Sequence, residues 1–167
     1  MRAAGEPSIA GKITVRAGGR KVVLVKRVGE SARHVLLKAI VFGLYVTAYP
    51  EIIVEPRFAG RYRPDLLQLG DDGVPLLWAE CGTTAHEKLA FLARAYPSTH
   101  LLVAKQAARI EPLAGAMAAI LAPLRRTAPL DLVNVPDDAE RFIGPTGELA
   151  VGFEDVDLRR FEPNKSA

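Results

Sequence analysis

The sequence contains a single cysteine, Cys81, and three scattered histidines. With one cysteine, no disulfide bond can form within these residues, which is typical of proteins from reducing compartments. The histidines and the cysteine do not have the spacing of zinc ligands. The sequence also lacks a GxxxxGK[ST] phosphate-binding loop and a GxGxxG turn after a strand. These absences argue against a disulfide-stabilised secreted domain, a zinc module and the common nucleotide-binding folds.

Long apolar runs are missing as well. The longest ones, Ile40–Tyr49 and Leu113–Leu124, are shorter than the roughly 20 residues that a helix needs to cross a bilayer. No apolar segment of the kind found in signal peptides follows Met1. We therefore expect a cytoplasmic protein that makes no contact with membranes.

The residues that are present have an ordinary globular composition, with 49% hydrophobic and 25% charged residues. A length of 167 residues suits a single domain. Apolar runs separated by Gly and Pro turns predict an α/β fold with a mixed central sheet flanked by helices. Its core should cover about residues 30–126, with helices at 30–47, 85–96 and 112–124 and strands at 52–58, 62–69, 74–81 and 100–104.

Two additions to this core are expected. Residues 12–28 read as a basic N-terminal hairpin around Gly18-Gly19. Residues 130–160 read as a C-terminal β extension that contains a second hairpin, with arms at 141–143 and 148–153. The second helix should begin at a capping box, with Thr84 as N-cap and Glu87 three residues later.

Two carboxylates stand out because they lie inside apolar strands. Asp65 precedes two leucines, and Glu80 follows Leu-Trp-Ala. A carboxylate in such a run must be paired, hydrogen-bonded or bound to metal, because burial of a bare charge is costly. Acidic residues on adjacent strands can share a magnesium ion, which often takes only one or two protein carboxylates. The alternative from the residues alone is ordinary ion pairing, for example with Arg61 or Arg63.

The sequence Pro64-Asp65, followed fifteen residues later by Glu80-Cys81-Gly82, resembles the motif of the PD-(D/E)xK nuclease superfamily. The expected order of helices and strands around it is similar to that superfamily's restriction-endonuclease-like core, and within it the YaeQ-like group. The resemblance covers roughly residues 12–106. It implies a metal-dependent nuclease in which Asp65, Glu80 and the backbone carbonyl of Cys81 hold Mg²⁺ or Mn²⁺.

The motif departs from the superfamily at one position. Lysine is expected two residues after the second acid, and this sequence has Gly82 there. Lys88, early in the next helix, could bring its ammonium back toward Glu80, and the YaeQ-like resemblance implies a migrated lysine of this kind. The alternative is that catalysis has been lost and the domain binds nucleic acid or a protein partner.

Other acidic residues could assist the site. Glu30 is a candidate by resemblance, since the first helix of the superfamily often supplies a glutamate, and Glu51 is its rival. Glu30, His34 and Lys38 recur every four residues on one helix face, but we interpret His34 as a surface or packing residue. Pairing the strands so that residue numbers sum to 119 places Glu55 on the face opposite Asp65, which argues against a ligand role.

Charge is distributed unevenly along the chain. Residues 1–38 carry nine lysines and arginines against two acidic residues, whereas residues 131–167 carry four against nine. A basic segment of this kind is typical of nucleic-acid binders, and the alternative is that the basic and acidic ends face each other. We expect nucleic acid as the partner, consider a homodimer, and assign phosphate contacts to five residues: Arg20, Lys21, Lys26, Arg61 and Arg63.

Overall fold

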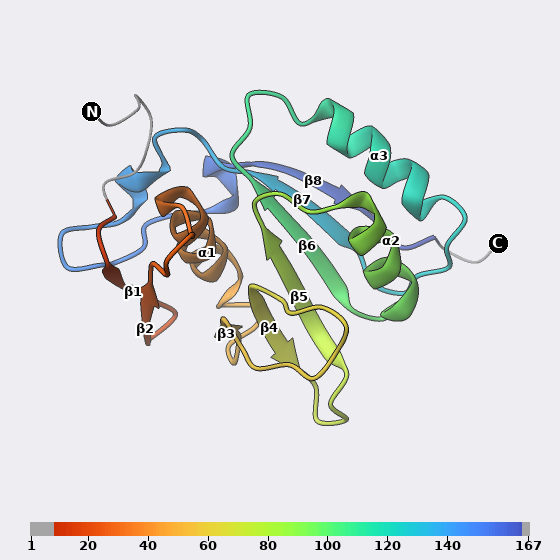
Figure 1. Cartoon of the computed structure of the whole chain (residues 1–167), viewed down its shortest axis with the longest axis horizontal. Helices are drawn as coiled ribbons and strands as arrows, with labels where there is room; N and C mark the ends of the chain where they lie inside the picture. Colours follow the sequence, from red (N-terminus) through yellow and green to blue (C-terminus); the bar gives the residue numbers. More distant parts are fainter. Residues whose placement is uncertain (1–8, 165–167) are drawn as a thin grey trace.

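The computed structural model describes residues 9–164, so the expectation that no signal peptide follows Met1 concerns residues outside this range. The described chain forms a six-stranded sheet, a separate hairpin and three α-helices (Figure 1). The hairpin consists of β1 (Lys12–Ala17) and β2 (Arg20–Val25), and the helices are α1 (Ala32–Tyr45), α2 (His86–Ala95) and α3 (Glu111–Leu121). The sheet contains β3 (Ile53–Val54), β4 (Leu66–Leu69), β5 (Pro75–Cys81), β6 (His100–Lys105), β7 (Leu130–Asn134) and β8 (Asp157–Phe161).

The strands of the sheet lie in the order β3-β4-β5-β6-β7-β8. β3, β4 and β5 are antiparallel neighbours, β5, β6 and β7 run parallel, and β8 returns antiparallel to β7. Each parallel step passes through a helix, α2 between β5 and β6 and α3 between β6 and β7, as parallel neighbours require. The predicted mixed α/β sheet flanked by helices is therefore confirmed.

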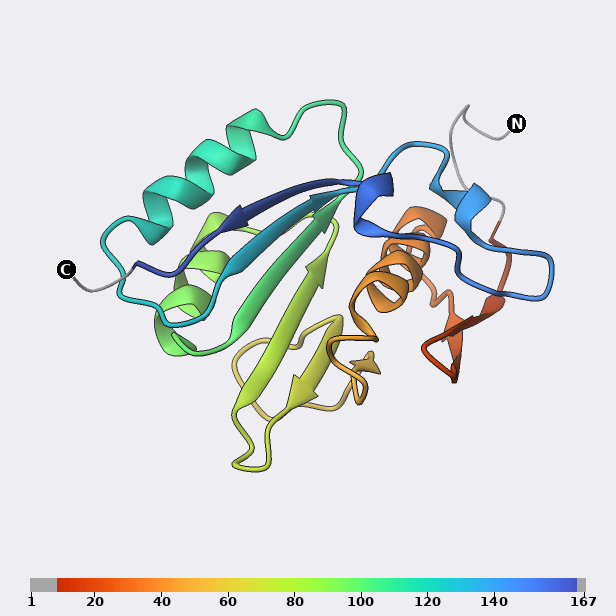
Figure 2. The ribbon, with the colours of Figure 1, turned by 180° about the vertical axis from the view of Figure 1, so that it is seen from behind.

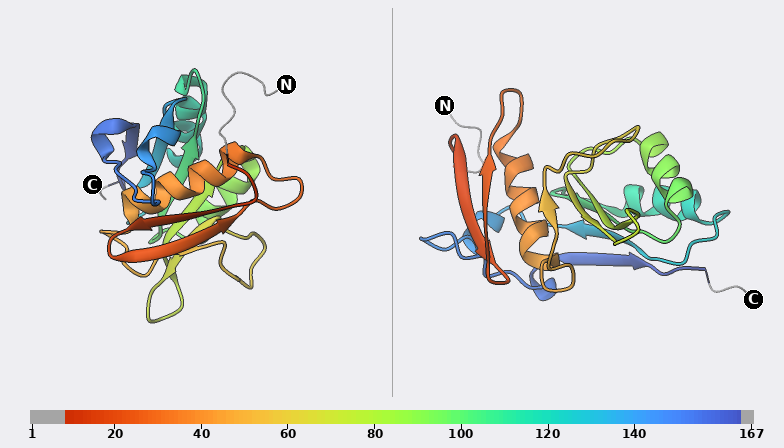
Figure 3. Two further views of the ribbon diagram at one scale, coloured as in Figure 1. Left: turned by 90° about the vertical axis from the view of Figure 1, so that its left-hand side faces the viewer. Right: turned by 90° about the horizontal axis from the view of Figure 1, so that it is seen from below.

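Helices cover both faces of the sheet. On one face α1 packs on alternate strand residues such as Leu66, Ala79 and Leu102, and the hairpin covers α1 from outside. On the other face α2 and α3 enclose Leu67 and Trp78. The successive layers of hairpin, α1, sheet and the α2–α3 pair are visible from below in Figure 3. Because successive strand residues point to opposite faces, each strand contributes to both cores.

The hairpin is attached through the C-terminal part of the chain. The N–H of Arg16 donates to Gly147 O at 2.8 Å, and the N–H of Leu149 donates to Arg16 O at 2.9 Å. These bonds form a short parallel bridge between β1 and the loop that precedes β8 (Figure 2). The acidic C-terminal part of the chain thus contacts the basic N-terminal hairpin directly.

A buried polar network lies where β6 and β7 begin. Asp131, which is 0% exposed, accepts hydrogen bonds from Tyr45 Oη at 2.7 Å and from Arg160 Nε at 2.7 Å. His100 Nε2 lies 2.8 Å from the same carboxylate, and its Nδ1 contacts Tyr49 Oη at 2.8 Å. Burial alone would raise the pKa of Asp131, but the hydrogen bonds from Arg160, His100 and Tyr45 hold it well below its usual range. The network joins α1 to three strands of the sheet.

Several local predictions were wrong, including the strands at 52–58 and 62–69, which are reduced to Ile53–Val54 and Leu66–Leu69. Helix α2 begins at His86 with Ala85 as N-cap and no side-chain cap bond, so the predicted capping box at Thr84 does not form. The predicted C-terminal hairpin is reduced to one antiparallel bridge, Ile143–Leu149, between the 3₁₀ helices η1 (Ala139–Phe142) and η2 (Phe153–Asp155). The rest of the predicted C-terminal β extension belongs to the central sheet, where β8 pairs with β7 and Arg160 lies beside Asp131.

Candidate functional site

The predicted acidic pair lies at the carboxyl end of β5. Asp65 is the residue before β4, and its N–H donates to Ala79 O at 2.9 Å. At the end of β5, the Asp65 side chain acts as the acceptor instead of a backbone carbonyl, and its Oδ2 accepts the N–H of Cys81 at 2.7 Å. Glu80 is the neighbouring residue on β5. The two residues therefore lie at the same edge of the sheet, but their side chains do not converge as predicted, because Asp65 contacts His34 of α1 and Glu80 contacts Lys88 of α2.

Glu80 faces helix α2 and is buried. Its Oε2 accepts a hydrogen bond from Lys88 Nζ at 2.7 Å, and its Oε1 accepts one from Trp78 Nε1 at 2.8 Å. Burial raises the pKa of Glu80, and the bonds from Lys88 and Trp78 oppose that rise. Lys88 Nζ also lies 5.3 Å from the centre of the Tyr62 ring. The expectation that Lys88 reaches back from the first turn of its helix to Glu80 is confirmed.

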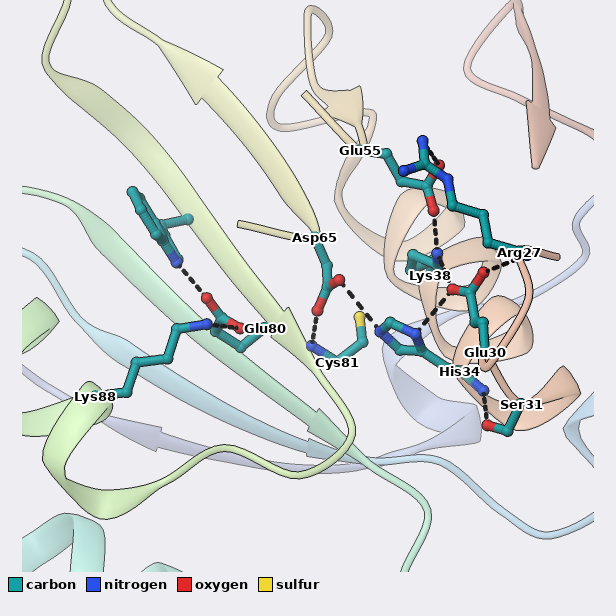
Figure 4. A network of polar contacts seen from close by, with 11 residues as sticks. Arg27, Glu30, Ser31, His34, Lys38, Glu55, Asp65, Glu80, Cys81 and Lys88 are labelled. Carbon is teal, nitrogen blue, oxygen red and sulfur yellow. Dashed lines mark hydrogen bonds and ion pairs between the residues drawn. The ribbon is translucent and has the colours of Figure 1, made fainter. Parts of the chain in front are cut away.

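Asp65 faces helix α1, where His34 links it to Glu30. His34 Nε2 is 3.2 Å from Asp65 Oδ1, and His34 Nδ1 is 2.8 Å from Glu30 Oε1 (Figure 4). The hydrogen bond with Asp65 raises the pKa of His34, burial opposes it, and the charge of Glu30 adds to the rise. Because both ring nitrogens face carboxylates, the doubly protonated imidazolium can donate to both.

The network continues to Lys38, whose side chain is only 1% exposed. Its ammonium pairs with both Glu30 and Glu55, and Arg27 Nη2 lies 3.3 Å from Glu55 Oε2. Burial favours the neutral form of Lys38, but the hydrogen bonds that its ammonium donates to both carboxylates raise its pKa. Burial would likewise raise the pKa of Glu30, which the bonds from Lys38 and the Arg27 N–H instead lower. These residues form a second group of charges beside Asp65.

The interpretation of Glu55 was wrong by one residue of register. β3 and β4 pair Val54 with Leu66, so the numbers sum to 120 and Glu55 lies opposite Asp65, with its N–H donating to Asp65 O at 2.7 Å. A shift of one residue reverses the face of every side chain. Glu55 also has a φ of 52°, the only positive value of a non-glycine residue among those described. It therefore joins the group around Lys38 rather than pointing away.

Comparisons with known proteins find similar structures but no similar sequences. No model of a protein family matches the sequence, and neither does any curated protein. The crystal structure of the YaeQ protein from Xanthomonas axonopodis pv. citri superimposes with a TM-score of 0.58 at 14% identity, over 83% of this chain and 80% of that one. The chain has a YaeQ-like fold. The YaeQ protein from Pseudomonas syringae gives a TM-score of 0.55 at 15% identity, over 75% of this chain and 66% of that one.

A cleft opens on the α1 side of Asp65 in this YaeQ-like fold. Its volume is about 1070 Å³, and His34, Lys38, Glu55 and Asp65 lie on its wall. Glu30 lines the same cleft, whereas Glu80 and Lys88 do not. The assisting role predicted for Glu30 stays a prediction, since Glu30 contacts Asp65 only through His34. Glu51, the rival candidate, is exposed, and its N–H binds Gln68.

The residues predicted to contact phosphates are not equally free. Arg20 donates from Nη1 to the carbonyls of Pro50 and Ile52, at 3.0 and 2.6 Å, which ties the hairpin to the segment after α1. Arg61 stacks on Tyr62 and pairs loosely with Glu87 at 3.6 Å. The remaining three have no partner among residues 9–164: Lys21 and Arg63 are exposed and Lys26 is half-buried.

The Cys81 thiol packs in the core on the α1 face, where burial raises its pKa well above the usual value. A buried thiol with a raised pKa is expected to be unreactive. His34, Lys38 and Glu55 were missed as site residues. The four-residue spacing of Glu30, His34 and Lys38 was a usable signal, because that spacing aligns side chains on one helix face.

The candidate ligands for a divalent cation are the two predicted carboxylates, Asp65 and Glu80. Among the residues described, no three His, Cys, Asp or Glu side chains group as metal ligands, so a zinc site is not formed. Magnesium often takes only two protein carboxylates and completes its shell with water and phosphate, but Asp65 and Glu80 would have to turn toward each other from the α1 and α2 sides of the sheet to share one ion. In this structure the two carboxylates bind different donors, His34 and Lys88 respectively.

No helix within residues 9–164 has the length and hydrophobicity to span a membrane.

Proposed function

We propose that this chain is a PD-(D/E)xK-type nuclease that cleaves phosphodiester bonds with Mg²⁺ or Mn²⁺ and uses a lysine from helix α2. The observation that carries the proposal is the contact of Lys88 Nζ with Glu80 Oε2 at 2.7 Å. It supplies the ammonium beside the second acid that Gly82 cannot provide. The YaeQ-like fold supports the proposal as an arrangement of strands and helices, without assigning an activity.

The position of glycine in the motif has a structural reason. Gly82 has a φ of 85°, a left-handed conformation that side chains rarely adopt. A lysine at this position would strain the backbone by about 1 kcal/mol or more. Lys88 sits one turn into the following helix and reaches the same carboxylate by its long stem. Migration of the lysine therefore avoids strain at the end of β5.

Each residue then has a defined part in the proposed reaction. Asp65, Glu80 and the backbone carbonyl of Cys81 would hold the cation, which polarises the phosphate and lowers the pKa of bound water. Lys88 orients the attacking water and offsets charge on the phosphate. Trp78 fixes the second oxygen of Glu80, and the N–H of Cys81 fixes Asp65 Oδ2. Both carboxylates are thus held in place by neighbouring donors.

The test is cleavage of plasmid, single-stranded DNA and RNA with Mg²⁺ or Mn²⁺. Lys88→Ala should lose cleavage about 100-fold or more, because proton transfer and orientation are worth factors of that size. It should keep its fold and its affinity for Mn²⁺, since lysine does not bind the ion. Asp65→Asn should lose Mn²⁺ affinity as well, measured by calorimetry.

A matched control is Arg94→Ala, which removes a positive charge from the last turn of the same helix. Its activity should stay at the wild-type level. A wild-type protein that cleaves none of the three substrates would contradict the proposal, as would full activity of Lys88→Ala.

The second candidate is a domain of the same fold that binds nucleic acid or a protein partner without catalysis. Its specific support is Asp65, whose two oxygens already accept from His34 and from the Cys81 N–H. Under this alternative the carboxylates are structural, and Asp65→Asn changes stability but not Mn²⁺ affinity.

A further inference from the structure

The cleft beside Asp65 has an uneven charge balance. Five cationic side chains line it, Arg27, His34, Lys38, Arg57 and Arg63, against the three carboxylates Glu30, Glu55 and Asp65. The carboxylates are already paired with Arg27, His34 and Lys38. Arg57 and Arg63 are exposed and have no hydrogen bond, ion pair or ring contact with any residue in the range 9–164. The cleft therefore offers two uncompensated guanidinium groups.

The loop between β3 and β4 places these two arginines on its opposite limbs. The bond from the Glu55 N–H to Asp65 O closes the loop at its base, and Arg57 and Arg63 each lie two residues inside that closure. Each is next to a proline, Pro56 or Pro64, whose fixed φ restricts the limb. Both arginines are thus presented on a backbone held at its base.

The size of the cleft limits what can enter it. A space of about 1070 Å³ is close to the upper end of small-molecule pockets, which suits one or two nucleotides. A duplex keeps its bases stacked inside, so only a single strand can place bases in the cleft. Phe58 and the fully exposed Val28 give the cleft apolar surface on which bases can rest.

We infer that this cleft binds a single-stranded segment of nucleic acid adjoining the cleaved bond, with Arg57 and Arg63 contacting its phosphates. The inference rests on the proposed function, in which the cleaved phosphate lies at Glu80 and Lys88. Asp65 connects the cleft with the proposed cleavage site, because it lines the cleft and accepts the N–H of Cys81, the residue after Glu80. A strand crossing the end of β5 would run from Lys88 into the cleft.

The experiment measures binding by fluorescence anisotropy, with a labelled 12-nucleotide single strand and the blunt duplex of the same sequence. It uses Lys88→Ala as the parent protein, so that the probe is not cleaved. The parent should bind the single strand at least tenfold more tightly than the duplex. Changing both Arg57 and Arg63 to Gln should weaken single-strand binding by roughly tenfold or more at low salt.

Salt dependence gives the sharper readout. The slope of log K against log salt is negative, and each lost phosphate contact on a single strand makes it shallower by about 0.7. The slope of the double variant should therefore be shallower by about 1.4. Arg125→Gln is the matched control, because Arg125 is exposed, unpartnered within the described chain and outside the cleft. It should leave both affinity and slope unchanged.

The outcomes separate this inference from the proposed function. Equal binding of duplex and single strand, an unchanged slope in the double variant, or no binding by the parent would overturn the inference. Cleavage by the wild type together with any of those results would leave the proposed function intact. Single-strand binding through Arg57 and Arg63 without cleavage by the wild type would instead remove catalysis and retain the cleft as a binding site.

Discussion

Asp131 illustrates how much a single buried charge contributes when three donors converge on it. Asp131→Asn leaves Arg160 without its counter-charge and should lower the free energy of unfolding at pH 7 by about 2–4 kcal/mol. Asp71→Asn, at an exposed turn position, should change it by less than about 0.5 kcal/mol. Urea denaturation of both variants measures the difference, and equal losses would contradict the importance of the network.

The same network sets an acid limit on stability. The pKa of Asp131 is lowered in the folded state, so its stabilisation is complete above its unfolded value of about 3.9. It is lost as the pH falls through the folded pKa. The gap between wild type and Asp131→Asn should therefore be constant from pH 7 to about pH 5 and shrink below about pH 4. A gap in the free energy of unfolding that widens on acidification would show that the pKa of Asp131 is not lowered in the folded state.

At the scale of single elements, helix α2 lacks a cap at the end that carries Lys88. Ala85 has the extended conformation of an N-cap residue, with φ −64° and ψ 140°, but its side chain cannot accept a hydrogen bond. Ala85→Ser should supply that acceptor and raise the free energy of unfolding by about 0.5–1 kcal/mol, seen as a higher Tm. Ala95→Ser, at the other end of the helix, should give no gain. Equal effects would rule out capping.

Elements differ in how far they could be predicted. β5, β6 and α1 are buried apolar runs bounded by turn residues, so the sequence pattern identified them. β3 has only two residues, and its register depends on the Glu55–Asp65 bond, which no local pattern encodes. The contact of Lys88 with Glu80 was predictable because both residues flank one short connection. The links from His34 and Lys38 to Asp65 and Glu55 required the packing of α1 on the sheet, which sequence spacing does not specify.

At the scale of the whole molecule, attachment of the hairpin depends on Gly147. Gly147 has a φ of 92°, and a Cβ there would lie 2.2 Å from Thr14 O in β1. Gly73 has a similar φ of 78°, with nothing within 4 Å of its Cβ position. Both alanine variants should cost about 1 kcal/mol for backbone strain, and Gly147→Ala should lose about 1–3 kcal/mol more.

Thermal unfolding of the two glycine variants measures this difference. Hydrogen exchange should show faster opening of β1 amides in Gly147→Ala only, because that clash lies against β1. Equal destabilisation of both variants would mean that the loop moves away from Thr14 without cost.

The bridge between β1 and the segment before β8 also has a consequence for the order in which the chain becomes native during its synthesis. Leu149 is made 133 residues later than Arg16, the residue of β1 to which it binds. Chains grow at about 5–20 residues per second, so the hairpin waits several seconds for its partner. Docking of the hairpin is therefore a late step, because it must wait until the segment before β8 has been made.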